Sequence, residues 1–231
     1  PLDNSVTPDP DVLKRVAELG APIEELKKKE VGETTDAIDG SRDNCRAREC
    51  AMGNLVSDAV LDRTKGQGVT IAIYNGGGLR ASIDKGTVTM GEVLTVLPFQ
   101  NTIATFQIKG EDLVAALEGG LSQLEDGAGR FPQVAGLKYS FDKSVAPNAG
   151  RISDVQVMDG ASWAPIDPAK VYTVATNDFM ARGGDGYVAF ADANNLIGAV
   201  DATLMASQVI DYVKVAGSVS PKVEGRIVLQ Q

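Results

Sequence analysis

The sequence predicts an α+β fold with a mixed sheet, and three observations lead to that prediction. An unbroken apolar run at 69–74 (VTIAIY) indicates a strand that is buried on both faces. Residues 104–108 and 137–141 alternate apolar with polar side chains, which is typical of strands with one wet face. Segments with helical periodicity separate the strands at irregular intervals, which argues against a regular βαβ repeat.

The chain begins with a polar, proline-punctuated lead-in over 1–10, followed by a helical pattern over 11–29. Apolar residues recur in that pattern at spacings of three and four, which places them along one helix face. They are Val12, Val16, Leu19, Ile23 and Leu26. We expect Pro22 to interrupt or kink the helix, because proline lacks a backbone N–H. A terminal helix of this kind suits a linker packed against another domain.

The later elements follow from the same patterns. Strands are expected at 171–177 and 226–229, a turn and then a strand at 83–87, and helices at about 48–63, 90–97, 111–121 and 202–215. Thr89 and Glu92 have the spacing of a capping box at the start of the second helix. Asp201 suits the N-cap of the last helix.

The composition excludes several classes of function. The 231 residues include 22 Lys and Arg against 31 Asp and Glu, a net charge of −9, so a nucleic-acid partner is not expected. No apolar run is long enough to span a membrane. The absence of histidine excludes a His-based zinc site, a Ser-His-Asp triad and a Cys-His dyad. The composition does not exclude an all-carboxylate metal site, but EF-hand spacing is missing. We expect no metal site and no catalytic residue in this chain.

Three consecutive glycines follow the apolar strand, in the segment 75–80 (NGGGLR). Glycine permits close backbone approach and positive φ, turn amides can form an anion-binding nest, and Arg80 adds a guanidinium group. The segment also fits the dinucleotide fingerprint G-x-G-x-x-A, which we reject because no long helix follows it. From the residues alone, a tight turn that simply requires glycine is an equal alternative.

Arg42, Arg46 and Arg48 cluster just before an expected helix, and guanidinium groups near a helix N-terminus suit phosphate. The alternative, which the pattern alone favours, is a solvated charged stretch that also contains Asp43 and Glu49.

Cys45 and Cys50 are the only cysteines, and they suggest a disulfide in an extracellular protein or two thiols in a cytosolic one. In a regular helix their Cα atoms would lie about 7.5 Å apart along the axis. That separation exceeds the limit of about 7 Å for a bridged pair, so a bridge requires the chain to turn before the helix begins.

Two phenylalanines lie beside turns. Phe99 follows Pro98, and Phe179 precedes the glycine-rich segment 180–187 (MARGGDGY). An aromatic ring next to such a turn often fills a core, and the residues alone favour that interpretation. The alternative is a pair of exposed rings that hold a planar ligand, with Asp185 at the hydroxyl groups of that ligand.

Taken together, these motifs resemble the C-terminal domain of the 5′-nucleotidase family. In chain order they are CRARECAMGNL, IYNGGGLR, VLPFQN, FPQVAGLKYSFD, ATNDFMARGGDGY and VEGRI, and they extend from about residue 31 to 229. Each motif alone is weak, but the ordered set is specific. The family combines an N-terminal metallophosphoesterase domain with a C-terminal nucleotide-binding domain. The resemblance implies a four-layer α/β/β/α domain over 31–231, with residues 1–30 as lead-in and linker helix.

The resemblance also implies roles for individual residues. It assigns the phosphate to Arg42, Arg46 and Arg80, the base to Phe99 and Phe179, the ribose hydroxyls to Asp185, further substrate contacts to Asn75, Gly77 and Gly78, and a disulfide to Cys45 and Cys50.

The function that the resemblance implies is hydrolysis of nucleoside 5′-phosphates by an intact two-domain enzyme, with this chain alone inactive. No cofactor is expected in this chain, and two divalent metal ions are expected in the N-terminal domain. The expected partners are that domain and an adenosine- or AMP-like ligand, and the expected location is periplasmic, secreted or cell-surface. Two alternatives stay open: a stand-alone nucleoside-binding module without catalysis, and the same domain of a UDP-sugar, cyclic-nucleotide or NAD hydrolase.

Overall fold

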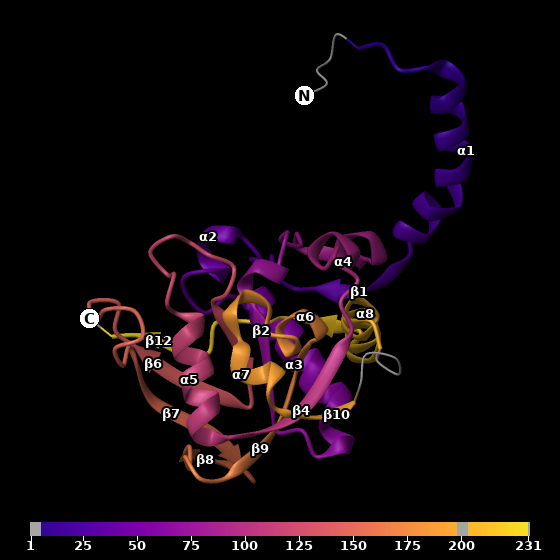
Figure 1. Ribbon diagram of the computed structural model, residues 1–231. Coiled ribbons are helices and arrows are strands. Elements are labelled where there is room, and N and C mark those ends of the chain that lie inside the picture. Colours follow the sequence, from indigo (N-terminus) through magenta and orange to yellow (C-terminus); the bar gives the residue numbers. More distant parts are fainter. Residues whose placement is uncertain (1–5, 198–202, 231) are drawn as a thin grey trace.

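The computed structural model describes residues 6–197 and 203–230, and Figure 1 shows how their helices and strands are arranged. The helices are α1 Pro10–Lys27, α2 Arg42–Cys45, α3 Ala51–Thr64, α4 Met90–Val96, α5 Gly110–Gly120, α6 Asp178–Ala181, α7 Val188–Ala191 and α8 Met205–Ala216, with 3₁₀ turns η1 Lys65–Gln67, η2 Gly76–Gly78 and η3 Gly184–Gly186. The strands are β1 Glu30–Thr34, β2 Ile71–Asn75, β3 Gly86–Thr89, β4 Ile103–Lys109, β5 Pro132–Ala135, β6 Leu137–Phe141, β7 Ile152–Asp159, β8 Ser162–Pro165, β9 Val171–Asn177, β10 Asn194–Ile197, β11 Ser218–Val219 and β12 Ile227–Leu229.

The strands form three sheets, and each sheet contains both parallel and antiparallel pairs. The five-stranded sheet has the order β10-β4-β9-β2-β5, in which only β2 and β9 run parallel. The four-stranded sheet has the order β12-β6-β7-β8, and the three-stranded sheet has the order β11-β1-β3. The expected α+β class with mixed sheets is therefore confirmed.

The central strand β2 is buried on both faces, as its apolar run predicts. Because successive side chains of a strand point to opposite faces, β2 contributes to two cores. Ala72 and Tyr74 join a core that includes residues of α3 and α8. Ile71 and Ile73 join a second core that includes residues of α5 and β6. Burial on both sides fixes the carboxyl end of β2, where the glycine segment begins.

Several sequence predictions match the structure closely. The strands expected at 137–141 and 171–177 coincide with β6 and β9, and β3 follows the turn expected after residue 83. The capping box is present, because the Thr89 hydroxyl accepts from the Glu92 amide and the Glu92 carboxylate accepts from the Thr89 amide. Asp201 lies outside the described residues, and α8 begins after the N-cap residue Leu204.

Helix α1 extends away from the sheets at one end of the molecule (Figure 1). It continues through Pro22, so of the two expected effects of this proline the interruption is ruled out. The apolar face predicted from its periodicity is exposed along its whole length, and no residue of α1 is buried. Among the described helices, α1 included, none is both long enough and apolar enough to cross a membrane.

Candidate functional site

A cavity of about 490 Å³ opens where several of the singled-out segments meet. The segment after α2, the turn η2, the loop after α4 and the α6–η3 segment all contribute to it. Its lining residues are Arg46, Asn75, Gly77, Gly78, Phe99, Asn101, Gly129, Phe179, Arg182 and Asp185. The fold thus brings seven of the nine predicted binding residues into one cavity, although they span 140 positions of the sequence.

The two remaining predicted residues, Arg42 and Arg80, lie beside this cavity. Arg80 is exposed at the rim, with its guanidinium carbon 5.6 Å from the centre of the Phe99 ring and a nitrogen 3.4 Å from the Gly77 carbonyl oxygen. Arg42 is also exposed, and it lines a neighbouring cavity that it shares with Arg46. Arg46 is thus the predicted arginine that faces both cavities.

Arg46 is the most buried arginine of the predicted set, with 9% of its surface exposed. One guanidinium nitrogen donates to the Gly127 carbonyl at 3.2 Å, while its buried Nε has no hydrogen-bond partner among the described residues. Burial lowers the pKa of Arg46 most, and the charges of Arg42 and Arg80 lower it further. This environment suits an anion. An anion would accept a hydrogen bond from the Nε of Arg46 and would offset the positive charge of the neighbouring arginines.

The segment that carries Arg46 is closed by a disulfide between Cys45 and Cys50, whose Cα atoms lie 5.1 Å apart. Helix α2 ends at Cys45 and α3 begins at Ala51, so the chain turns between the cysteines as a bridge requires. Both cysteines are buried. The bridge therefore holds a short loop, residues 45–50, against the core, with Arg46 at its start.

Glu49, in the same loop, corrects the interpretation of this segment as a solvated charged stretch. Its side chain is buried, and its carboxylate accepts hydrogen bonds from the backbone amides of Glu224 and Arg226 and from the side chain of Asn54. The first and last motifs of the resemblance therefore meet in space. Arg42 and Arg48, by contrast, are exposed.

The three glycines are required for close packing within the chain, and none of them has a positive φ. A Cβ atom on Gly77 would lie 2.7 Å from the Cα of Gly129, and one on Gly78 would lie 2.5 Å from the hydroxyl of Tyr74. The Gly76 and Gly77 amides donate to the carbonyls of Phe131 and Gly129. Close packing, and not a positive φ, is therefore what requires glycine here, and these two amides are not available for an anion-binding nest.

Asn75 and Asp185 belong to a hydrogen-bonded chain at the wall of the cavity. The Asn75 side-chain amide donates to the Asp185 carboxylate at 2.7 Å and accepts from Asn177 at 2.9 Å. The side-chain oxygen of Asn177 in turn accepts a hydrogen bond from the backbone amide of Met180 and so caps α6. Asp185 adopts a positive φ of 55°, a left-handed conformation that is uncommon outside glycine, asparagine and aspartate. Such backbone strain persists where the surroundings hold it in place, as this chain does.

Phe99 and Phe179 are exposed, at 56% and 43%. This exposure rules out the interpretation that the two rings fill a core. The ring of Phe179 lies against Gly184, where a Cβ atom would come within 2.6 Å of it. Both rings therefore line the cavity without being part of a core.

Asn101, Gly129 and Arg182 also line the cavity and were not singled out from the sequence. Asn101 and Arg182 both donate to the carboxylate of Asp178, at 2.9 and 2.7 Å. Burial alone would raise the pKa of Asp178, but these hydrogen bonds and one from the Thr102 amide outweigh burial and lower it. Asn101 and Arg182 lie within the motifs VLPFQN and ATNDFMARGGDGY, and these motifs could have pointed to them as cavity residues. Nothing in the local sequence marks Gly129 as a cavity residue.

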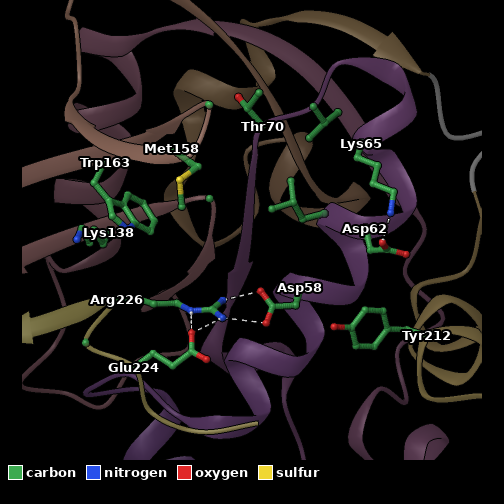
Figure 2. Close-up of a pocket in the computed structure, with 15 residues that line it drawn as sticks. Asp58, Asp62, Lys65, Thr70, Lys138, Met158, Trp163, Tyr212, Glu224 and Arg226 are labelled. Atoms are coloured by element: carbon green, nitrogen blue, oxygen red, sulfur yellow. Dashed lines mark hydrogen bonds and ion pairs between the residues drawn. The ribbon is translucent and has the colours of Figure 1, made fainter. Parts of the chain in front are cut away.

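A larger cavity, of about 740 Å³, lies between α3, α8 and the four-stranded sheet (Figure 2). The cationic groups drawn there already have partners. Arg226 is paired with Asp58 and Glu224, and Lys65 with Asp62, while the Lys138 ammonium lies 4.4 Å from the centre of the Trp163 ring. None of the predicted binding residues lines this cavity. The ion pairs of the described residues thus include Arg226 and Lys65 of this cavity but not Arg46.

Metal ligands are not grouped in the described parts of the chain, residues 6–197 and 203–230. Within them, no three His, Cys, Asp or Glu residues are arranged so that they could hold a metal ion. The donor set of the described residues therefore offers no site for the two divalent ions, which the resemblance assigns to the N-terminal domain.

The fold of this chain and its ordered motifs are those of a known domain family. Residues 30–192 match the family model described as 5′-nucleotidase, C-terminal domain, so the chain belongs to this family. It is 40% identical over 231 residues to the trifunctional nucleotide phosphoesterase protein YfkN of Bacillus subtilis (strain 168), and 32% identical over 240 residues to human 5′-nucleotidase. Each match covers 98% of this chain but only 16% and 41% of those proteins.

Solved structures agree with this assignment. The 5′-nucleotidase precursor from Thermus thermophilus superposes with a TM-score of 0.88 at 38% identity, covering 95% of this chain and 43% of that one. The NAD nucleotidase of Haemophilus influenzae superposes with a TM-score of 0.77 at 25% identity, covering 96% and 42%. The fold is that of a 5′-nucleotidase C-terminal domain, as the resemblance implied, and the chain spans less than half the length of these relatives.

Proposed function

We propose that this chain is the nucleotide-binding domain of a two-domain 5′-nucleotidase-like phosphohydrolase. One observation carries the proposal: the 490 Å³ cavity combines a cation, exposed aromatic rings and a carboxylate. These are the groups that a phosphate, a base and a ribose diol require. Arg46 would bind the phosphate through its unpaired Nε, with Arg80 at the rim and Arg42 behind it.

The nucleoside would occupy the other side of the cavity. Phe99 and Phe179 would hold the base between them, since base–aromatic stacking contributes roughly 1–3 kcal/mol per base. Asp185 would accept hydrogen bonds from the ribose hydroxyls, while Asn75, Gly77 and Gly78 line the wall that the substrate contacts. An adenosine- or AMP-like ligand fits this arrangement.

The hydrolytic step would require a second domain. This chain has no histidine, and its described residues offer no metal-ligand cluster, so we assign the two divalent ions to an N-terminal metallophosphoesterase domain. The exposed apolar face of α1 supports a role for residues 1–30 as the linker to that domain, with the nucleotide-binding domain beginning at residue 31. The buried disulfide supports export to the periplasm, the cell surface or the medium.

Calorimetric titration of the 231-residue chain tests the proposal. AMP, adenosine and ribose 5-phosphate are compared at equal concentration and ionic strength. We expect AMP to bind most tightly, because it alone engages both the arginine and the aromatic parts of the cavity. Equal affinity for AMP and ribose 5-phosphate would remove the aromatic contact from the proposal, and no binding of any of the three would overturn it.

A further inference from the structure

The side chain of Gln133 lies at the centre of the contacts that hold the Arg46 loop. Gln133 belongs to β5 and is completely buried. Its Nε2 donates to the carbonyls of Cys45 and Arg48, at 3.0 and 2.7 Å, and its Oε1 accepts from the amide of Cys50 at 3.1 Å. The amide thus uses both of its protons and its oxygen on one short stretch of backbone, residues 45–50.

Neighbouring positions are shaped around this side chain. A Cβ atom on Gly53 would lie 2.4 Å from Oε1 of Gln133, so only glycine leaves room for the amide at that point of α3. The Cys45 carbonyl that Gln133 binds is also packed directly against Gly76, where a Cβ atom would collide with it. Gln133 therefore fixes the loop against the turn η2, which lines the cavity.

The same strand also positions the opposite wall. In the β2–β5 pair, Gln133 is the partner of Tyr74, and Pro132 is the partner of Asn75. Asn75 binds the carboxylate of Asp185. One strand pair thus sets the distance between Arg46, on the loop that Gln133 holds, and the Asn75–Asp185 pair.

We propose that Gln133 is a positioning residue that holds the loop 45–50 so that Arg46 faces the phosphate of a nucleotide whose sugar is held at Asp185. The proposal rests on the proposed phosphate contact of Arg46. Without the amide, the Cys45 carbonyl and the Cys50 N–H would lose their partner in a buried setting, and the Arg48 carbonyl would lose its partner in a part-buried one. Such groups reorient to find new partners. The loop would then move relative to Asn75, and phosphate affinity would fall while the nucleoside side of the cavity kept its shape.

Two substitutions remove the contact in different ways. Gln133→Leu removes all three hydrogen bonds at similar volume. Gln133→Glu keeps the shape and an acceptor for the Cys50 amide, but it places an oxygen opposite the two carbonyls. Should the leucine variant fail to fold, the glutamate variant carries the test. Val60→Ala, in a buried apolar position of α3, serves as the control for lost stability without a lost hydrogen bond.

The experiment measures dissociation constants for AMP and adenosine, together with hydrogen exchange of the backbone amides of residues 45–50. We expect both Gln133 variants to weaken AMP at least about fivefold, with adenosine changed less than about twofold and with faster exchange in the loop. Val60→Ala should leave the ratio of the two constants unchanged. An unchanged ratio in the Gln133 variants, when Arg46→Met lowers AMP affinity, would overturn the positioning role alone. An unchanged AMP affinity in Arg46→Met would overturn the phosphate contact and the positioning role with it.

Discussion

The side-chain amide of Asn75 donates a 2.7 Å hydrogen bond to the carboxylate of Asp185, joining the end of β2 to the turn η3 across 110 residues of sequence. This contact holds the Asp185 carboxylate at the wall of the cavity. The backbone of Asp185 has a φ of 55° there. One oxygen of the carboxylate is thus anchored by the protein. The anchored group is prepared to accept further hydrogen bonds from a ligand without first having to be ordered.

Asp185→Asn tests the proposed ribose contact. Asparagine tolerates positive φ and can still accept from Asn75, so the backbone should be retained. We expect adenosine affinity to fall by roughly 1.5 kcal/mol or more, about tenfold, because a charge-assisted hydrogen bond is lost. The affinity for 2′,3′-dideoxyadenosine, which lacks the diol, should change much less. Titration of both ligands decides the matter, and an equal loss for the two would contradict the assignment.

Phe99→Ala and Phe179→Ala test the proposed base contact. Because both rings are exposed, each change should cost much less stability than the roughly 3–5 kcal/mol expected for truncating a buried ring. Phe106→Ala, at a fully buried ring, provides that reference. Adenosine affinity should fall by roughly 1–3 kcal/mol in each exposed-ring variant. Thermal melts and titrations measure the two effects, and a Phe99 or Phe179 variant as unstable as Phe106→Ala would show that the rings support the fold.

The strands were predictable where local pattern and tertiary environment agree. β6 alternates cleanly and β9 carries a β-branched apolar run, and both were located to the residue. The strand β5 was missed because its four residues, PQVA, are too short to show a period. The hairpin of β7 and β8 was missed although Asp159-Gly160 lies at its turn, because many of its side chains are exposed or half-buried and mark no core face.

Most residues that line the candidate cavity could be predicted from sequence motifs, but their contacts could not. Sequence motifs singled out Arg46, Asn75 and Asp185. The reason for the three glycines, however, lies in Cys45, Gly129 and Tyr74, which local pattern does not connect to them. Likewise, the burial of Glu49 depends on backbone amides near residue 225. Such long-range partners are set by strand pairing and loop packing, which no local periodicity encodes.

The disulfide gives a prediction about both the stability and the ligand affinity of the chain. Replacing Cys45 and Cys50 by alanine should lower the free energy of unfolding by roughly 2 kcal/mol in the chain-entropy model for so short a loop. AMP affinity should fall as well, because Arg46 lies within the bridged loop, whereas adenosine affinity should be nearly unchanged. Denaturant unfolding and titration measure these effects. Before substitution, a thiol titration of the denatured, unreduced chain should find no free thiol, and two free thiols would count against the bridge.

Asp178 gives a prediction about pH. Its pKa is lower in the folded chain than its ordinary value of about 3.9, because its hydrogen bonds outweigh its burial. The carboxylate therefore contributes stability that is fully present above about pH 4 and is lost as the pH falls through the lowered pKa. Asp178→Asn lacks this contribution, so it should be less stable at pH 7, and the gap to the unsubstituted chain should close toward pH 2. Urea unfolding across this range measures the gap, and a constant gap would show that titration of Asp178 does not contribute.

The arginines should separate phosphate binding from nucleoside binding. Arg46→Met keeps the apolar stem of a buried side chain and removes the guanidinium, so it should weaken AMP by roughly 1.5–3 kcal/mol while leaving adenosine nearly unchanged. Arg80→Met, at the exposed rim, should have a smaller effect in the same direction, since water screens its charge. Arg42→Met should have the smallest effect, because Arg42 lines the neighbouring cavity and would act on a phosphate at Arg46 only over a distance. Titrations with AMP and adenosine at low and high salt measure all three, and the Arg80 and Arg42 effects should shrink in salt more than the Arg46 effect. Equal losses for AMP and adenosine in Arg46→Met would mean that the arginine supports the shape of the cavity and does not hold the phosphate.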